Sequence, residues 1–316
     1  MSEPEISVVM SVYNGEKHLD ECIGSILGQS FRDFELIIVN DCSMDGSLKI
    51  IERYEKSDHR IKVINNPENL GLTKSLNIGI KISRGKYIAR IDADDICSPD
   101  RFEIQYQFLE KQKHIFLAGS GTDKIDESGN TVSRHRPIVE EKEIEKELSL
   151  HNCVSHPTIM FRNEGFTYRE KFVYAQDYDF YLILLSGGKK ISNIPEPLVK
   201  YRISPCAISW SKKAKQDLFA LKANEFYQQR LKNGSDQYGS FNPGEILHIE
   251  IEESTDRLVL KSEIEASFKL NDFKRVRKLC RTYCIHYGFV NCGSCYYVLS
   301  FAGERVINKV RLILFS

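Results

Sequence analysis

The stretch GKYIARIDADD, residues 85–95, runs from an apolar segment directly into three carboxylates. Residues 87–91 predict a buried strand, and Asp92, Asp94 and Asp95 follow it. Three acids at the end of a buried strand repel one another and lose hydration, which is costly unless a cation neutralises them. Carboxylate oxygens suit Mg²⁺ or Mn²⁺ and leave coordination positions open for phosphate oxygens and water. The stretch therefore predicts a divalent-metal site, because capping the following helix would use one acid and not three.

Apolar runs and helical stripes alternate on the N-terminal side of this stretch. Near-continuous apolar runs predict buried strands, and apolar residues at i, i+3, i+4 and i+7 predict helices that lie on a sheet. Strands are expected at 6–12, 34–39, 61–64 and 87–91, and helices at about 19–27, 48–54 and 70–83. Alternation at this spacing predicts a parallel, right-handed α/β sheet.

Polar residues follow three of the expected strands. In such sheets ligands bind beyond the carboxyl ends of the strands, so these residues are expected to line one crevice. They are Tyr13 and Asn14 after the first strand, Asp41, Ser43 and Asp45 after the second, and residues 92–95 after the fourth.

The pattern changes from residue 115 onward to shorter strands and turns. We expect a hairpin tip at 127–130, a strand at 156–163, a helix at 175–188 and an edge strand at 194–204, where Pro195 and Pro197 limit pairing. Beyond Trp210 the composition predicts helices. We therefore expect two domains, residues 1–210 and 211–316, with a loop around 233–244 in the second.

The composition is that of a soluble globular protein with a substantial core. The 316 residues are 41% hydrophobic and 28% charged. The nine cysteines form no regular framework, no signal peptide precedes the first strand, and no apolar run approaches the roughly 20 residues of a membrane helix. These features predict a cytoplasmic protein that does not span a bilayer.

Charge is unevenly placed, although the net charge is zero. Residues 269–316 hold nine Lys or Arg against two acids. The basic cluster at 274–281 predicts peripheral contact with anionic lipid at the inner membrane face, and a solvated helix face is the alternative. No nucleic-acid-binding module accompanies the cluster, so a nucleic-acid partner is not expected.

Four cysteines near the end of the chain have a spacing that resembles a zinc site. Cys280 and Cys284 form C-x₃-C, and Cys292 and Cys295 form C-x₂-C. The first two also fall on an apolar helical stripe, where cysteine is a small hydrophobic residue. Both interpretations remain open from the sequence.

Seven segments, taken in order, resemble the family-two glycosyltransferases, inverting enzymes with the GT-A fold. The segments are SVVMSVYNG, FELIIVNDCSMDGS, NLGLTKSLNIGI, GKYIARIDADD, HPTIMFR, AQDYDF and KYRIS. The resemblance covers about residues 5–210, and residues 211–316 match no known pattern. It implies a Rossmann-like mixed sheet flanked by helices, followed by a mainly helical C-terminal region.

The resemblance also implies how a donor would be held. Tyr13 would stack on the uracil of a UDP-sugar and Asp41 would accept a hydrogen bond from its ring nitrogen; a strand-end turn is the alternative for both. Asp94 would bind Mn²⁺ or Mg²⁺ at the diphosphate, and Asp92 would face either the metal or the ribose. Lys74 would approach the diphosphate, unless it belongs to a solvated helix face. The implied donor-binding set is Ser11, Tyr13, Asn14, Asp41, Lys74, Asp92 and Asp94.

Asp177 matches the general base of the family. Gln176 precedes it where glutamate is usual, which removes one negative neighbour and leaves the base in place. Asp179 is the reserve candidate, and ordinary acids at a helix N-terminus are the alternative for both. Many relatives carry histidine where this chain has Ser204, so no metal role is assigned there. The loop that contains Trp210 would be a lid over the donor or a linker.

The expected function is metal-dependent, inverting transfer of a hexosyl or N-acetylhexosaminyl group from a nucleotide-sugar, with a UDP-sugar expected. The acceptor is expected to be a hydroxyl of a lipid-linked glycan in bacterial O-antigen, capsule or other surface polysaccharide synthesis. The alternative is a non-catalytic subunit that keeps the nucleotide pocket. A sugar-phosphate nucleotidyltransferase is disfavoured because its Gly-rich N-terminal phosphate loop is absent.

Overall fold

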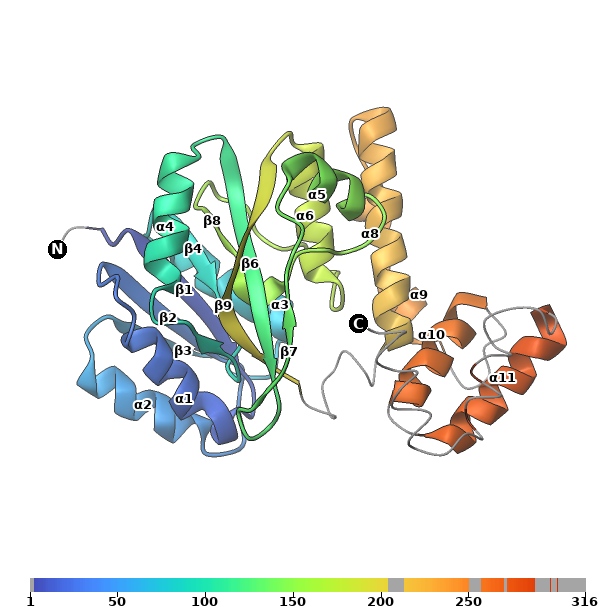
Figure 1. Ribbon diagram of the computed structural model, residues 1–316, viewed down its shortest axis with the longest axis horizontal. Helices are drawn as coiled ribbons and strands as arrows, with labels where there is room; N and C mark the ends of the chain where they lie inside the picture. Colours follow the sequence, from blue (N-terminus) through green and yellow to red (C-terminus); the bar gives the residue numbers. More distant parts are fainter. Residues whose placement is uncertain are drawn as a thin grey trace. The chain divides into compact units, whose positions relative to one another are not determined.

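A mixed sheet forms the centre of the N-terminal part of the chain. The computed structural model describes residues 3–203, 213–249, 257–269 and 272–287, together with residues 296 and 300. The described strands form a nine-stranded sheet in the order β3-β2-β1-β4-β8-β6-β9-β5, and β7 pairs with β6 (Figure 1).

The first half of the sheet is parallel, as the sequence predicts. Strand β1 pairs in parallel with β2 and β4, and β2 pairs in parallel with β3. The predicted alternation is confirmed in the elements β1 (Ile6–Val12), α1 (Glu16–Leu27), β2 (Phe34–Asn40), α2 (Ser47–Ser57), β3 (Ile61–Asn65), α3 (Leu72–Ile82) and β4 (Tyr87–Arg90).

Helices cover both faces of this parallel half. The apolar stripe of α1 packs in one core with alternate residues of β1, among them Val8 and Met10. Helix α3 lies against the opposite face, where Gly79 is so close to Val9 that a Cβ would clash. Because both faces are covered, the strands read as continuous apolar runs. Because β1 is parallel to β2 and β4, the carboxyl ends of these three strands lie at one edge of the sheet.

The second half of the sheet is antiparallel or mixed. Strand β4 pairs antiparallel with β8, β8 pairs antiparallel with β6, and β6 pairs in parallel with β9. The elements are β5 (Ile96–Cys97), α4 (Arg101–Lys111), β6 (Ile115–Ile125), β7 (Thr131–His135), α5 (Glu141–Leu148), the 3₁₀ turn η1 (His156–Thr158), β8 (Met160–Arg162), α6 (Gln176–Ser186) and β9 (Lys190–Arg202). The predicted hairpin tip at 127–130 is confirmed. The predicted strand at 156–163 is confirmed only in its second part, β8, because residues 156–158 form the 3₁₀ turn η1.

The prediction of an edge strand at 194–204 is wrong. Strand β9 lies between β6 and the two-residue strand β5. Its prolines are accommodated by a register shift, since Ser120 pairs with Ile194 while the next residue, Gly121, pairs with Pro197. Pro195 lies inside this irregularity and Pro197 at its end. The strand therefore continues through the interior of the sheet although both prolines lack a backbone N–H.

The described C-terminal residues are helical, as predicted. The elements are α8 (Lys213–Asn233), the 3₁₀ turn η2 (Tyr238–Ser240), α9 (Gly244–Leu247), α10 (Arg257–Lys269) and α11 (Phe273–Tyr287). Leu260, Ile264 and Phe268 of α10 pack with Val276 and Cys280 of α11 in a separate small core. No helix among the described residues is long and apolar enough to cross a membrane.

The chain separates into two compact units. One comprises Met1–Ser204 and Ala223–Gly239, and the other Pro205–Lys222 and Ser240–Ser316. The predicted boundary near 210 falls at residues 204–212, outside the described residues, and stays a prediction.

A buried carboxylate anchors the amino end of the parallel strands. Glu35 on β2 accepts hydrogen bonds from the Ser7 hydroxyl at 2.7 Å and the Arg84 backbone N–H at 2.9 Å, and Lys62 and Arg84 form ion pairs with it at 2.8 and 2.9 Å. Burial alone would raise the pKa of Glu35, but these donors outweigh it and lower the pKa to about 2.

Because the folded-state pKa of Glu35 lies below its ordinary value of 4.5, its stabilising effect is present above pH 4.5 and is lost as the pH falls toward 2. We expect Glu35→Gln to lower the free energy of unfolding by up to about 3 kcal/mol at pH 7, with a difference from wild type that shrinks below pH 4. Urea unfolding at pH 7, 4 and 3 measures this. Glu145→Gln, which removes an exposed ion pair with Lys190, should change stability by about 0.5 kcal/mol or less. A pH-independent loss in Glu35→Gln would contradict the prediction.

Candidate functional site

The loops that follow β1 and β2 are joined by hydrogen bonds. The Asn14 backbone N–H donates to the Ser43 hydroxyl at 3.0 Å, and the Asn14 side-chain carbonyl accepts from the Met44 backbone N–H at 2.8 Å. Asn14 has φ 52°, a left-handed conformation that asparagine tolerates better than most residues. Tyr13 is 53% exposed and Ser11, near the end of β1, is half-buried. The Tyr13 ring is therefore accessible to a stacking partner at the edge of the sheet.

Asp41 organises the loop before α3. Only 2% of this residue is exposed. One carboxylate oxygen accepts from the Asn66 amide and the Leu70 backbone N–H, both at 2.8 Å, and the other accepts from the Gly71 backbone N–H at 2.9 Å. Gly71 has φ 84°, which L side chains rarely adopt, so this closure depends on glycine. Lys74 is exposed on the first turn of α3, directly after this loop.

Asp92 is paired with a buried arginine. Both of its oxygens accept from Arg90, one at 2.6 Å from Nη1 and the other from Nη2. The Arg90 side chain is 3% exposed and its Nε has no partner among the described residues. Arg90 is not among the residues predicted from the sequence, although a charged residue inside the apolar run 87–91 is a visible signal. The pair leaves each Asp92 oxygen only one further acceptor position.

Asp94 and Asp95 complete the acidic loop. Burial, followed by the nearby charge of Asp92, raises the pKa of Asp94 to about 6, and His18 opposes the shift. Burial and both neighbouring acids also raise the pKa of Asp95. Asp95 Oδ1 accepts from the Arg202 backbone N–H at 2.8 Å, whereas its buried Oδ2 has no partner among the described residues. Neighbouring acids therefore raise the pKa values of both Asp94 and Asp95, and a cation at Asp94 would oppose this effect.

Asp177 lies in the first turn of α6. Its Oδ2 accepts from the Asn152 amide at 2.7 Å. Ala175, the residue before the helix, has φ 53°, an uncommon conformation for alanine that turns the chain into the helix. Burial raises the pKa of Asp177, against the opposing effects of the Tyr178 backbone N–H, the Arg90 charge and the Asn152 hydrogen bond. A half-buried carboxylate with a raised pKa is the form that a general base needs.

Arg90 connects the acidic loop electrostatically with Asp177. Its charge acts on the pKa values of Asp94, Asp95 and Asp177. It also lowers the pKa of buried His156, after the larger effect of burial, so this imidazole is neutral. His156 forms a hydrogen bond of 2.7 Å with the Tyr168 hydroxyl. Arg90 is thus hydrogen-bonded to one predicted metal ligand, Asp92, and its charge also acts on Asp94 and on the predicted base Asp177.

Asp179 is not suited to serve as a base. It is 0% exposed, and Arg169 donates to it at 2.8 Å from Nε and also from Nη2. Arg169 Nη1 donates to Asp236 at 2.8 Å, and the guanidinium carbon lies 4.4 Å from the centre of the Tyr238 ring. This cage ties α6 to the chain after α8. The structure therefore assigns Asp179 a structural role and leaves Asp177 as the base candidate.

Several predicted features lie outside the described residues. These are Ser204, the loop with Trp210, and Cys292 and Cys295 of the candidate zinc site. Cys280 is buried in the core of α10 and α11. In the part of the chain that the structure describes, no group of three or more His, Cys, Asp and Glu side chains could hold a metal ion.

Two solved structures share the fold. The chain matches S. aureus TarS 1–349 in complex with UDP with a TM-score of 0.56 at 18% identity, over 98% of this chain and 91% of that one. It also matches the mannosyltransferase PcManGT from Pyrobaculum calidifontis, in complex with GDP-Man and Mn²⁺, with a TM-score of 0.54 at 12% identity. This match covers 100% of this chain and 89% of that one. The fold is therefore of the GT-A-like class, a mixed sheet flanked by helices with a helical C-terminal region, as predicted.

The sequence comparisons define the family. Residues 7–169 match the family described as "Glycosyl transferase family 2". An uncharacterized glycosyltransferase of Methanocaldococcus jannaschii is 39% identical over 226 residues, which are 70% of this chain and 78% of that protein. The O-antigen biosynthesis glycosyltransferase WbnJ of Escherichia coli is 31% identical over 233 residues, which are 71% of this chain and 90% of that protein. This chain belongs to the family-two glycosyltransferases and is a glycosyltransferase, which confirms the resemblance.

Proposed function

We propose that this glycosyltransferase moves a sugar from a UDP-sugar to a hydroxyl of a bacterial surface polysaccharide, with a divalent metal and with inversion at the anomeric carbon. The observation that carries the proposal is Arg90, which is hydrogen-bonded to Asp92 of the acidic loop and whose charge acts on both Asp94 and Asp177. A nucleotide-diphosphate site and a base are the two parts that a direct displacement requires. No protein nucleophile is needed for it.

The acidic loop fits a divalent cation. Burial and Asp92 raise the pKa of Asp94, so its charge is destabilised unless a cation is near. Asp94, with the remaining acceptor positions of Asp92, would supply one or two hard oxygen ligands, as is usual for Mg²⁺ or Mn²⁺ at a diphosphate. Such a metal supplies Lewis-acid stabilisation of the departing diphosphate. PcManGT, which shares the fold, was determined with Mn²⁺, and this supports the proposal.

Asp177 would accept the proton of the acceptor hydroxyl. The hydroxyl oxygen forms the new bond to the anomeric carbon as the bond from that carbon to the diphosphate breaks, and UDP leaves. The hydroxyl proton passes to Asp177, which Asn152 holds in place at 2.7 Å. One displacement with one base inverts the anomeric configuration, and general-base assistance of this kind contributes about 10²–10⁴-fold.

The donor-binding residues would lie along the edge formed by the β1 and β2 loops. Tyr13 is exposed enough to stack on a base. Asp41 already accepts three hydrogen bonds, so it has room for one further donor, such as a single ring N–H of uracil. Ser11, Asn14 and Lys74 are proposed to complete the donor contacts. TarS was determined with UDP and also with UDP-GlcNAc, which supports a uridine donor.

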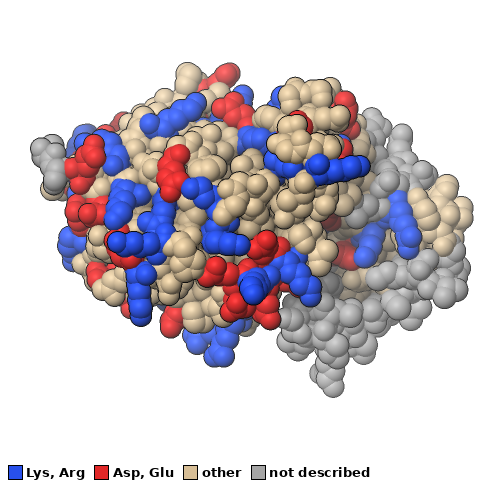
Figure 2. Space-filling model, turned by 90° about the horizontal axis from the view of Figure 1, so that it is seen from above, with Lys and Arg blue, Asp and Glu red and all other residues tan. Residues whose placement is uncertain are grey.

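Helix α11 is proposed to rest on an anionic membrane that carries a lipid-linked acceptor. Lys274, Lys278 and Arg281 are exposed on it at helical spacing, and its opposite face is buried against α10. The name of the relative WbnJ supports an acceptor in O-antigen synthesis. By contrast, basic and acidic side chains are interspersed over the described residues on the face shown in Figure 2. This pattern does not favour nucleic acid as a partner on that face.

A screen of UDP-sugars and GDP-mannose, with and without Mn²⁺, tests the proposed function. We expect metal-dependent release of UDP from at least one UDP-sugar, increased by glycan acceptors and reversed by EDTA. Release of GDP alone would overturn the choice of uridine. Tight UDP binding without transfer to any acceptor, together with an Asp177→Asn variant that equals wild type, would support a non-catalytic binding subunit instead.

A further inference from the structure

Arg202, the last residue of β9, binds three separate segments beside the acidic loop. Its side chain is only 2% exposed. The guanidinium donates to four oxygen atoms: the Asp94 backbone carbonyl at 2.9 Å, the Asp126 and Glu127 backbone carbonyls at 3.0 and 3.2 Å, and the Glu21 carboxylate at 2.7 Å. These acceptors belong to the acidic loop, the β6–β7 hairpin tip and α1.

The backbone of Arg202 holds the same loop a second time. Its N–H donates to Asp95 Oδ1 at 2.8 Å. Two successive residues of the acidic loop are thus fixed by one residue of β9, one through its carbonyl and the other through its carboxylate. The Asp94 side chain leaves the backbone at the Cα atom directly before these two attachments, so they restrict its direction.

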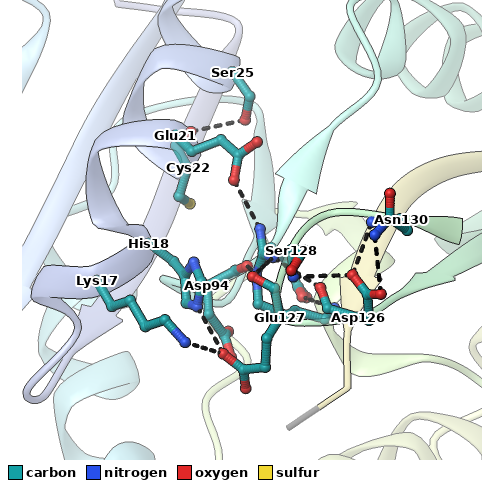
Figure 3. Close-up of polar contacts among 12 residues, drawn as sticks. Lys17, His18, Glu21, Cys22, Ser25, Asp94, Asp126, Glu127, Ser128 and Asn130 are labelled. Carbon is teal, nitrogen blue, oxygen red and sulfur yellow. Dashed lines mark hydrogen bonds and ion pairs between the residues drawn. The ribbon is translucent and has the colours of Figure 1, made fainter.

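The hairpin tip and α1 are bound to each other beside this arginine. Asp126 Oδ1 accepts from the backbone N–H groups of Ser128 and Asn130, both at 2.9 Å, which closes the tip on itself. Glu127 forms an ion pair with Lys17 and a hydrogen bond of 3.2 Å with His18 Nε2, so the tip is bound to α1 directly. Figure 3 shows Lys17 and His18 of α1 facing Glu127 of the tip, with Asp94 in the same group.

The chemistry of this environment requires arginine. A guanidinium presents several donors in a fixed planar fork, whereas an ammonium is a point charge on a flexible stem. Three of the four acceptors are carbonyls, and Glu21 is the charged one, so a buried lysine would leave carbonyls on different segments unsatisfied.

We propose that Arg202 is a positioning residue, which fixes Asp94 in the direction that metal and donor binding require. The inference rests on the proposed function, because Asp94 is the proposed metal ligand. Groups that orient metal ligands typically change metal affinity by 10–100-fold when they are replaced. A residue that only stabilised the fold would instead lower the melting temperature and leave the metal affinity of the folded protein unchanged.

Calorimetric titration of UDP at a series of Mn²⁺ concentrations tests the proposal on the full chain. We expect Arg202→Lys to raise the half-saturating Mn²⁺ concentration about 10–100-fold in folded protein. The matched control is Arg134→Lys, the same change at a hairpin arginine that is 55% exposed and paired with Asp123, and it should stay within about twofold of wild type. A wild-type half-saturation in folded Arg202→Lys would overturn the positioning role.

A milder variant keeps the test decisive if Arg202→Lys does not fold. Glu21 is 55% exposed on α1, so Glu21→Gln should fold while weakening one charge-assisted hydrogen bond to Arg202. We expect its half-saturating Mn²⁺ concentration to rise about threefold to tenfold. No change in this variant would then refute the inference. Absence of Mn²⁺-dependent UDP binding in wild type would refute the proposed function itself, and the two failures are therefore distinguishable.

Discussion

Replacing Asp94 with alanine is expected to abolish metal-dependent release of UDP from the UDP-sugar that wild type uses. The departing diphosphate needs its developing charge neutralised. Arg90 donates to both oxygens of Asp92, so Asp94 is the more available of these two carboxylates for a metal ion. Loss of several kcal/mol of charge stabilisation corresponds to a decrease of at least about 10³-fold in kcat/KM. Coupled detection of UDP at saturating Mn²⁺ measures it.

The same variant should not be less stable without metal. Since burial and Asp92 raise the pKa of Asp94, its charge opposes folding at neutral pH, and Asp94→Ala should melt at the wild-type temperature or slightly above it. Mn²⁺ with UDP should raise the melting temperature of wild type and not that of Asp94→Ala. The control is Asp100→Ala, an exposed acid in the same connection without a side-chain capping bond, which should behave as wild type. Residual metal-dependent activity near the wild-type level in Asp94→Ala would contradict the metal assignment.

Local sequence patterns were sufficient for the parallel half of the fold. Strands buried on both faces and helices with one apolar stripe are visible within ten or so residues, and the carboxyl ends of parallel strands must share an edge. The acidic loop after β4 and the polar turn after β1 therefore followed from the sequence. Asp177 did not: it entered only through a family resemblance, because an acid at a helix start has an ordinary structural explanation.

The residues that organise the site depend on contacts between distant parts of the chain. Arg202 donates to Glu21 across 181 positions, and Asn152 donates to Asp177 across 25. The hydrophobic periodicity of the sequence does not predict contacts between residues that are so far apart. Arg90 was detectable as a charge within an apolar strand, but its partner is only two positions away and its electrostatic effect on Asp177 requires the fold. The position of β9 inside the sheet could not be predicted for the same reason. Its prolines indicate an edge strand, and only the register shift against β6 accommodates them in the interior.

Asp177→Asn is expected to lower kcat about 10²–10⁴-fold, the range for loss of a general base, while UDP and Mn²⁺ bind as in wild type. Asparagine has nearly the same shape and keeps an oxygen that can accept from Asn152, so the fold should be preserved. Single-turnover transfer, with UDP binding measured by calorimetry, separates the two effects. Asp179→Asn is the contrasting control: it breaks the buried pair with Arg169, so it should lose about 3–5 kcal/mol of stability while its folded fraction remains active.

The pH dependence of transfer provides an independent check of the same base. Burial raises the pKa of Asp177 above its ordinary 3.8, so kcat should fall as the pH drops through a value above 3.8, because the protonated carboxyl cannot accept the hydroxyl proton. The Asn152 hydrogen bond opposes this shift, so Asn152→Ala should move the acid limb to higher pH and leave the plateau rate less affected. A merely structural Asn152 would lower stability without moving the limb. An acid limb that survives unchanged in Asp177→Asn would show that another group accepts the proton.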